Sequence, residues 1–323
     1  MKKQAVCSVA LSHPDTFFPL LEQALHLERH FPQQQANYRQ RHVGKEVVSF
    51  FLEASTRTRS SFELACHRWG ATVLSFNAEH SSLSKGETID DTLETFLAMG
   101  VDAVVLRQGQ DRLPHSLADT YGHELHLINA GDGKNDHPTQ GLLDCMTLVQ
   151  CVNHQWEALR NERFVIVGDV LHSRVVGSLL PYLKTLGMEV VITAPPYFMP
   201  TAEHQAYLSR TYGVCFEPEL TTALQGARFV YGLRIQHERL VQRISLEDYT
   251  QAYQLTPALL QRLAHPAVRF LHPGPVNRGV EATSALVDDA ILSLVRQQVH
   301  NGVFARMAVL DWCFNPYINS QFK

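Results

Sequence analysis

The chain has 323 residues, of which 45% are hydrophobic and 19% charged, and this balance excludes a disordered protein. A formal net charge of −4 excludes nucleic-acid binding through a broad basic surface, so any anion site has to be local. The apolar runs stay below the roughly 18 residues of a membrane-spanning helix. The six cysteines are scattered, which is typical of reduced thiols. We expect a cytoplasmic protein with neither a nucleic acid nor a membrane as partner.

In chain order, short apolar runs alternate with longer amphipathic ones, a pattern that predicts parallel strands covered by helices. In the first half we predict strands over 46–52, 72–76, 102–106 and 125–128, and helices over 58–69, 88–99 and 139–152. In the second half we predict strands over 163–167, 189–193, 214–216, 229–233 and 268–271, and helices over 174–186, 202–212 and 257–263.

The succession of strands pauses at the polar stretch 153–161, and we place a domain boundary there. The predicted fold class is therefore α/β, with two domains that are each a parallel sheet flanked by helices. The first domain covers residues 1–150 and the second 151–289. A last helical run, from 285 to about 309, is long enough to pack back on the first domain, which the segment from about 290 to 323 completes. We expect the three glutamines at 33–35 to form a loop.

The segment after the first predicted strand reads STRTRS and begins at Ser55. A helix that starts on small hydroxyl residues presents backbone N–H groups at the positive end of its dipole. Thr56 and Thr58 add hydroxyl groups, and Arg57 adds a planar cation. The segment is either a phosphate site or an ordinary helix cap with solvent-facing arginines, and the pattern alone leaves both open. We expect Arg59 to be structural and to pair with a carboxylate.

Two more polar segments follow in the first half. The segment from His80 to Thr88 contains Ser81 and Lys85, and taken alone it favours a surface loop over a site. The segment 129–140 has two glycines that allow a sharp turn after a strand, and its Pro138 suits a first helical turn.

His137 and Gln140 belong to the second of these segments and lie beyond a strand's carboxyl end, where open parallel sheets bind ligands. A structural role and a ligand-binding role for His137 remain equally open.

Strand ends in the second half carry a matching set of polar residues. Arg174 lies near a helix start and suggests an anionic substrate, whereas the absence of GxGxxG disfavours a dinucleotide. Arg234 and Gln236 end another strand and suit a carboxylate. Pro273 and Gly274 form a rigid turn that either presents backbone carbonyls to a substrate or merely connects two elements. We find no zinc-ligand spacing and no nucleophile elbow, and we expect neither a metal nor a cofactor.

Taken in order, SxRTR, SKGET, HPTQ, GD…HSR, RxQxER and HPGPxxRG resemble the aspartate/ornithine carbamoyltransferase family. The resemblance runs from about residue 46 to the closing GVFARMAVL, and HPTQ and HPGP resemble the aspartate branch. It implies transfer of the carbamoyl group of carbamoyl phosphate to L-aspartate, an early step of pyrimidine biosynthesis. One alternative is a carbamoyltransferase for another amino acid, and Arg234 and Gln236 disfavour a cationic one. The other is a catalytically silent homologue, which the retained His137, Arg57 and Lys85 disfavour.

The resemblance also implies a set of site residues. Those that bind carbamoyl phosphate are Ser55, Thr56, Arg57, Thr58, Ser81, Lys85, Arg107, His137, Gln140, Pro273 and Gly274. Those that bind aspartate are Lys85, Arg174, Arg234 and Gln236, and the catalytic ones are Arg57, Thr58, Lys85, Arg107 and His137.

By the same resemblance, the active site is expected between the two domains at the interface of a homotrimer, with Ser81 and Lys85 supplied by the neighbouring subunit. Further assembly with a regulatory chain or a dihydroorotase stays open.

One departure from the family pattern follows Arg107. The family usually has a His-Pro pair there, whereas this chain reads Gln-Gly-Gln-Asp from Gln108 to Asp111. The arginine is retained, but the pattern does not predict how the next loop folds.

Overall fold

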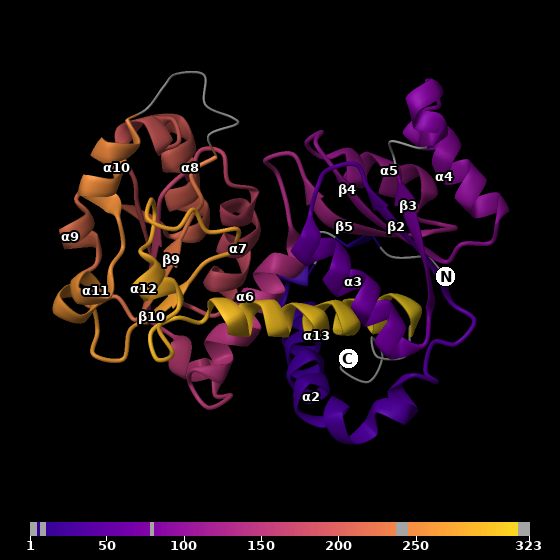
Figure 1. Cartoon of the computed structure of the whole chain (residues 1–323), viewed down its shortest axis with the longest axis horizontal. Helices are drawn as coiled ribbons and strands as arrows, with labels where there is room; N and C mark the ends of the chain where they lie inside the picture. The colour runs from indigo at the N-terminus through magenta and orange to yellow at the C-terminus, as the bar shows by residue number, and fades with distance from the viewer. Residues whose placement is uncertain (1–4, 7–10, 78–80, 237–244, 316–323) are drawn as a thin grey trace. The chain divides into compact units, whose positions relative to one another are not determined.

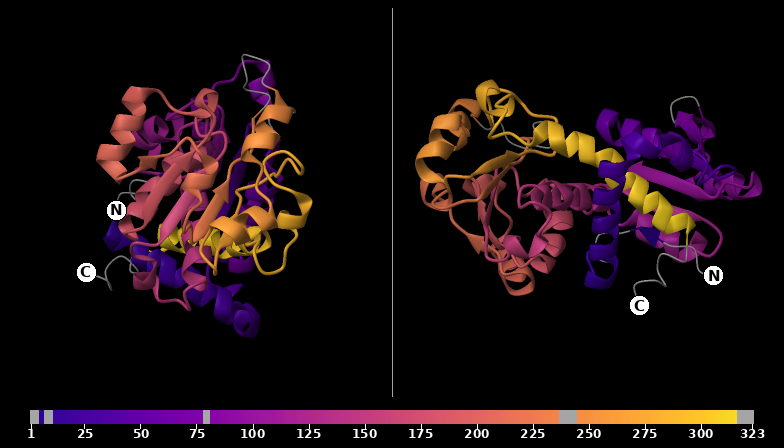
Figure 2. Two further views of the ribbon diagram at one scale, coloured as in Figure 1. Left: turned by 90° about the vertical axis from the view of Figure 1, so that its left-hand side faces the viewer. Right: turned by 90° about the horizontal axis from the view of Figure 1, so that it is seen from below.

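The computed structural model describes residues 5–6, 11–77, 81–236 and 245–315. The chain forms two compact units (Figure 1). Unit 1 comprises Met1–Met146, Gly177–Leu179 and Val299–Lys323, and unit 2 comprises Thr147–Val176 and Leu180–Gln298. Each unit contains a parallel sheet with helices packed on it, as two further views show (Figure 2). The predicted fold class is thereby confirmed.

The sheet of unit 1 has, within the described ranges, five parallel strands in the order β1-β5-β4-β2-β3. These strands are β1 (Ala5–Val6), β2 (Glu46–Phe51), β3 (Thr72–Asn77), β4 (Ala103–Gln108) and β5 (His126–Asp132). Phe51 pairs with Arg107, and Leu106 pairs with Asn129. The loops after β2, β4 and β5 therefore leave the sheet side by side, at the carboxyl ends of its strands. These loops carry most of the predicted site residues of the first half.

Helices of unit 1 cover the sheet with large apolar side chains. Its helices are α2 (Pro14–Tyr38), α3 (Thr56–Trp69), α4 (Ile89–Ala98), α5 (Leu113–Tyr121) and most of α6 (Pro138–Gln150), with a 3-10 turn over Ser82–Lys85. Phe50 of β2 lies edge-on to Phe96 of α4, and Leu117 of α5 belongs to the same buried cluster. Burial of each such side chain contributes about 1.5–3 kcal/mol. The packing gives the strand-end loops a rigid base.

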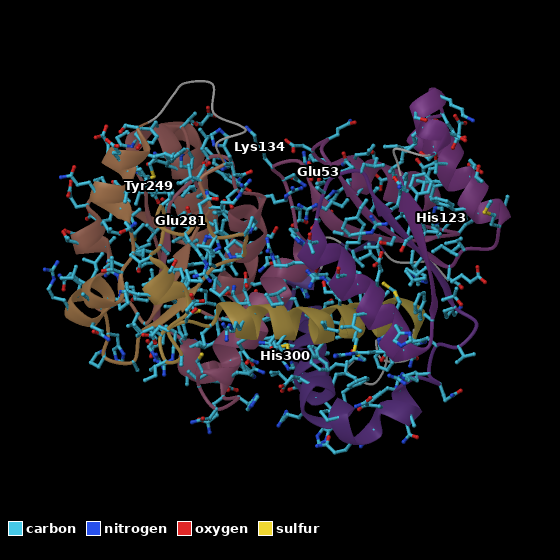
Figure 3. All side chains as sticks on the ribbon, viewed as in Figure 1. Glu53, His123, Lys134, Tyr249, Glu281 and His300 are labelled. Carbon is cyan, nitrogen blue, oxygen red and sulfur yellow. The ribbon has the colours of Figure 1, made fainter. Side chains whose placement is uncertain are left out.

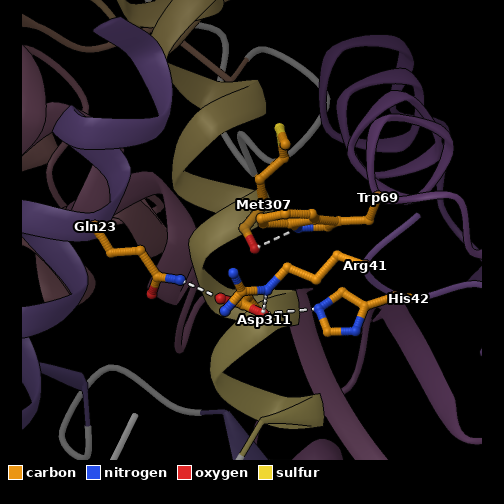
Figure 4. Close-up of polar contacts among 6 residues, drawn as sticks. All are labelled: Gln23, Arg41, His42, Trp69, Met307 and Asp311. Carbon is orange, nitrogen blue, oxygen red and sulfur yellow. Dashed lines mark hydrogen bonds and ion pairs between the residues drawn. The ribbon is translucent and has the colours of Figure 1, made fainter. Parts of the chain in front are cut away.

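The C-terminal helix α13 (Val295–Phe314) packs on unit 1, as predicted (Figure 1). The indole Nε1 of Trp69 in α3 donates 2.8 Å to a backbone carbonyl of α13. Asp311 of α13 is fully buried and meets Arg41 Nε at 2.9 Å and His42 Nε2 at 2.7 Å, and it also accepts a hydrogen bond from Gln23 of α2 (Figure 4). One carboxylate thus joins α13 to α2 and to the segment after it.

The sheet of unit 2 also has five parallel strands within the described residues, in the order β10-β9-β6-β7-β8. They are β6 (Arg163–Val167), β7 (Glu189–Thr193), β8 (Cys215–Phe216), β9 (Phe229–Gly232) and β10 (Arg269–Leu271). The helices are α7 (Arg174–Thr185), α8 (Ala202–Tyr212), α9 (Leu220–Ala223), α10 (Leu246–Tyr253), α11 (Pro257–Leu263) and α12 (Ser284–Val287), with 3-10 turns over Trp156–Leu159 and Pro196–Phe198. No helix in the described part of the chain is both long and apolar enough to cross a membrane.

One predicted helix is wrong. The run from 285 to about 309 is not continuous, because α12 ends at Val287 and α13 begins at Val295. Between them, Asp289 Oδ1 accepts the backbone N–H groups of Ile291 and Leu292, which competes with helical hydrogen bonding. The chain then pairs with Phe270 of β10 through backbone bonds of 2.7 and 2.8 Å. An aspartate turn and a strand-like contact therefore interrupt the helix.

The other predicted elements are present, with ends that mostly differ by one or two residues, although β5 runs on to Asp132. The pattern missed β1, α2, α5, α9 and α10. The glutamines at 33–35 belong to α2 and not to a loop, although Gln34 has non-helical angles where the helix kinks.

Candidate active site

The start of α3 presents an anion-binding geometry without a glycine-rich loop. Ser55 occupies the cap position in an extended conformation, but its side chain makes no capping hydrogen bond with the helix. First-turn N–H groups of a helix have no intrahelical acceptor, and the helix dipole adds positive potential there. The first turn contains Thr56, Arg57 and Thr58 and no acidic residue. An anion would therefore meet N–H groups, hydroxyls and a guanidinium together.

Arg59 makes structural contacts instead. Its Nε lies 3.0 Å from Glu63 Oε1 one turn further along α3, and its guanidinium donates to the Phe76 carbonyl at 3.3 Å. The prediction that Arg59 pairs with a carboxylate is confirmed.

Thr58 and His137 meet although 79 residues separate them. Thr58 Oγ1 lies 3.3 Å from His137 Nε2, and both side chains are buried. The His137 backbone N–H donates 2.5 Å to Ser178 Oγ, which in turn donates 2.7 Å to Asp136 Oδ1. Sequence reasoning missed Ser178, because nothing in its local pattern separates it from an ordinary helical serine.

Gln140 lies in the first turn of α6 and is fixed by a buried carboxylate. Its Nε2 donates 3.0 Å to Asp144 Oδ1, and Asp144 is fully buried. Arg306 of α13 is buried as well, and its guanidinium lies 5.1 Å from the Phe62 ring. Burial, the largest cause, and the charge of Arg107 both lower the pKa of Arg306, Asp144 acts in the opposite direction, and the net pKa is about 9. These charges behind the strand edge are thus partly balanced.

Arg107 at the end of β4 is held on two sides. Its Nη1 donates 3.2 Å to the Ala130 carbonyl in β5, and its Nε lies 3.5 Å from Glu53 Oε2. Glu53 follows β2 and is labelled in Figure 3. Sequence reasoning did not select Glu53, although a lone carboxylate two residues before STRTR was a usable signal for a partner of an arginine.

Ser81 caps the short 3-10 turn after β3, and Lys85 is the last residue of that turn. Ser81 Oγ accepts the Leu83 N–H at 3.3 Å, and Lys85 is exposed. Thr88 and Asp91 form a reciprocal cap at the start of α4. Lys85 is thus exposed, whereas Thr58 and His137 are buried.

In unit 2 the remaining predicted residues follow neighbouring strands. Arg174 begins α7 after β6, Arg234 and Gln236 follow β9, and Pro273 and Gly274 follow β10. Because β10, β9 and β6 are adjacent and parallel, these segments share one edge of the sheet. The next three residues of the RxQxER motif, 237–239, lie outside the described residues.

Asp169 organises part of that edge. Its fully buried carboxylate accepts the Gln236 N–H at 3.3 Å and lies 2.8 Å from His172 Nδ1. Gln236 Nε2 donates 2.8 Å to the His172 carbonyl, so the loops after β6 and β9 are joined. After β10, the Gly274 N–H donates 2.9 Å to His272 Nδ1.

Two parallel α/β units, each with basic and amide side chains where neighbouring strands end, place the chain in the class of open α/β proteins, which bind ligands at the carboxyl ends of their strands. Family models agree with this class. The carbamoyl-P binding domain of aspartate/ornithine carbamoyltransferases matches residues 5–150, and the Asp/Orn binding domain matches residues 160–313. The chain belongs to the aspartate/ornithine carbamoyltransferase family.

Individual relatives give the same result. The aspartate carbamoyltransferase catalytic subunit of Gloeobacter violaceus is 48% identical over 275 residues, which is 83% of this chain and 82% of the relative. The aspartate transcarbamoylase of Trypanosoma cruzi, solved with N-(phosphonacetyl)-L-aspartic acid, is 28% identical with a TM-score of 0.82, covering 96% of this chain and 95% of that one. The ornithine carbamoyltransferase of Thermus thermophilus, at 24% identity and a TM-score of 0.78 over 93% and 95% of the two chains, shares the fold.

Proposed function

We propose that this chain is an aspartate carbamoyltransferase, which transfers the carbamoyl group of carbamoyl phosphate to the amino group of L-aspartate. The products are N-carbamoyl-L-aspartate and phosphate, and the reaction serves pyrimidine biosynthesis. The contact between Thr58 and His137 carries the proposal, because it joins a hydroxyl and an imidazole at a helix N-terminus suited to phosphate. The aspartate transcarbamoylase of Trypanosoma cruzi has been solved with aspartate and phosphate and with carbamoyl phosphate and aspartate.

The phosphate of carbamoyl phosphate would lie at the start of α3. Backbone N–H groups of the first turn and the hydroxyls of Ser55, Thr56 and Thr58 would donate to its oxygens, and Arg57 would balance its charge. In this proposal residues 1–150, with the segment from about 290 onward, form the carbamoyl-phosphate domain. Residues 151–289 form the aspartate domain, where Arg174, Arg234 and Gln236 would hold the carboxylates of aspartate.

The chemistry requires positioning and charge stabilisation. The neutral α-amino group of aspartate attacks the carbamoyl carbon and forms the new C–N bond, which gives a tetrahedral oxyanion. Thr58, Arg107 and His137 would stabilise that oxygen, and Gln140 would orient the carbamoyl amide. The bond from carbon to the phosphate oxygen then breaks, with Arg57 balancing the charge of the leaving group. The departing phosphate takes the proton that the amine loses. The backbone carbonyls of Pro273 and Gly274 would accept from the carbamoyl amide.

The assay measures phosphate release from carbamoyl phosphate with L-aspartate, with L-ornithine or with no amine. Turnover with aspartate alone is expected, and its absence would reject the proposal. Thr58→Val removes the hydroxyl at nearly constant volume and should lower kcat about 100-fold, as the loss of an oxyanion donor typically does. Thr72→Val in β3 is the matched control, because Thr72 is exposed. Equal activity of both variants would remove Thr58 from the mechanism.

We further propose a cytoplasmic homotrimer with shared active sites, in which Ser81 and Lys85 of one subunit serve the site of the next. The exposed position of Lys85 supports this assignment. Mixed trimers of Lys85→Ala and Arg57→Ala subunits should recover part of the activity that each variant lacks, because some sites would contain both native residues. If every mixture stays inactive, the sites are not shared. The native mass of material from the source cells would then reveal any regulatory or dihydroorotase chain.

A further inference from the structure

The segment after Arg107, in which this chain departs from its family pattern, folds into a turn closed by its own side chain. Gln108 is 3% exposed. Its amide group donates to the Gln110 carbonyl and accepts the Gln110 N–H. The donor and the acceptor of this buried amide both find partners two residues away. These two hydrogen bonds fix the turn, so it needs no proline to hold its shape.

The turn is bonded to the loop that follows β5. The Gly133 N–H donates 3.0 Å to the Gln108 carbonyl, and the Lys134 N–H donates 2.6 Å to Asp111 Oδ1. Lys134 is labelled in Figure 3. Gly133 has φ +42°, and a Cβ there would lie 1.8 Å from Asp111 Oδ1, so the close approach of the two loops needs a glycine at this position.

Asp132 extends this connection toward His137. Its carboxylate is fully buried and accepts the Arg112 N–H at 2.7 Å from the turn. It also accepts the side-chain amides of Asn129 and Asn135, each at 2.9 Å, and the Asp136 N–H at 3.0 Å. Four donors on one carboxylate fix the loop immediately before His137.

We propose that the segment 108–112 is a clasp that positions His137 relative to Arg107, with Asp111 as a positioning residue. Arg107 immediately precedes the clasp in the chain, and its Nη1 also donates to the Ala130 carbonyl of β5. The clasp would hold the loop after Arg107 in one conformation. The inference rests on the proposed function, because it assumes that Arg107 and His137 act on the same oxygen.

The decisive variant is Asp111→Ala, which removes the acceptor of the Lys134 N–H. Asp111→Asn keeps an oxygen at the same position without the charge, and it should restore the bond. Asp119→Ala is the matched control, because Asp119 is an exposed carboxylate on α5 of the same unit. Melting temperatures of all three variants check that they are folded.

Two measurements test the clasp. Hydrogen exchange by mass spectrometry reports the backbone N–H groups of 133–136. Steady-state kinetics report kcat and the KM for carbamoyl phosphate. Asp111→Ala should exchange at least tenfold faster in this segment, and its kcat should fall about tenfold, which is ~1.4 kcal/mol of barrier. Its KM should change less than its kcat, because the phosphate contacts at α3 are untouched while Arg107 and His137 act chiefly on the developing oxyanion. Asp111→Asn and Asp119→Ala should resemble the parent chain.

The clasp is rejected if Asp111→Ala exchanges at the parent rate, if its kcat is unchanged, or if Asp111→Asn is equally impaired. If the parent chain shows no aspartate-dependent turnover, the proposed function is rejected and the kinetic measurement no longer tests the clasp. In that case the exchange arm still decides whether Asp111 orders the loop before His137.

Discussion

Removal of the Asp311 carboxylate should destabilise unit 1 strongly. Asp311 is fully buried on α13 and meets Arg41, His42 and Gln23. Asp311→Ala leaves the buried His42 ring and the Gln23 amide without this acceptor, at about 1–3 kcal/mol each. The Arg41 side chain is 41% exposed and can turn to water, so its loss adds little.

The sum is about 4 kcal/mol, a large share of the 5–15 kcal/mol that typically separates folded from unfolded chains. At 2–4 °C per kcal/mol, the melting temperature should fall by about 8–16 °C. Asp311→Asn keeps one acceptor oxygen and should lose about half as much.

Tryptophan fluorescence during thermal and urea unfolding suits the measurement, because the Trp69 ring lies 5.3 Å from the His42 ring. Asp288→Ala, which removes an exposed ion pair with Arg278, serves as the control and should change the melting temperature little. If Asp311→Ala melts within 2 °C of the parent chain, Asp311 does not anchor the C-terminal helix.

Three further predictions concern stability and thiols. Burial raises the pKa of the Cys66 thiol to about 12. The stability that the buried neutral thiol contributes is therefore complete below the pKa near 9 of the unfolded chain, and it is lost as pH rises toward 12. Cys66→Ala should flatten that alkaline loss of stability in urea titrations. Among the five cysteines that the structure describes, Cys215 is the exposed one, and a thiol reagent should label it before the other four in the native protein, a step that Cys215→Ser should remove. Gly70→Ala should lower the free energy of unfolding by more than about 2 kcal/mol, because φ is +77° and a Cβ would lie 1.9 Å from a backbone oxygen. Gly44→Ala, at φ +84° with no atom within 4 Å of the new Cβ, should lower it by about 1 kcal/mol. Equal urea midpoints for the two variants would refute the steric argument.

The strand-end segments were predictable because a parallel sheet places its polar loops at one edge. Thr58 and His137 could be named from sequence for that reason, and the structure brings them within 3.3 Å. The helix start at Thr56 and the proline at the start of α6 follow local rules of helix initiation.

Residues that support the site could not be predicted in the same way. Ser178 contacts His137 across 41 residues, and Asp132 gathers donors whose positions depend on a turn without a recognisable pattern. The long helix α2 was missed because Pro19 and Pro32 lie inside it and proline argues against a helix interior. These features depend on tertiary packing, which overrides local propensity.

The composition of unit 1 has a consequence for synthesis on the ribosome. Residues 299–314 of α13 pack in unit 1, yet they are translated after every residue of unit 2. Domains generally fold as their chain emerges, N-terminal first. Here unit 2 can complete its sheet while unit 1 still lacks its last helix and the carboxylate of Asp311. The apolar surfaces of α2 and α3 that α13 covers would stay exposed until then. A chaperone that binds apolar segments of nascent chains would therefore find these two helices accessible for the longest time.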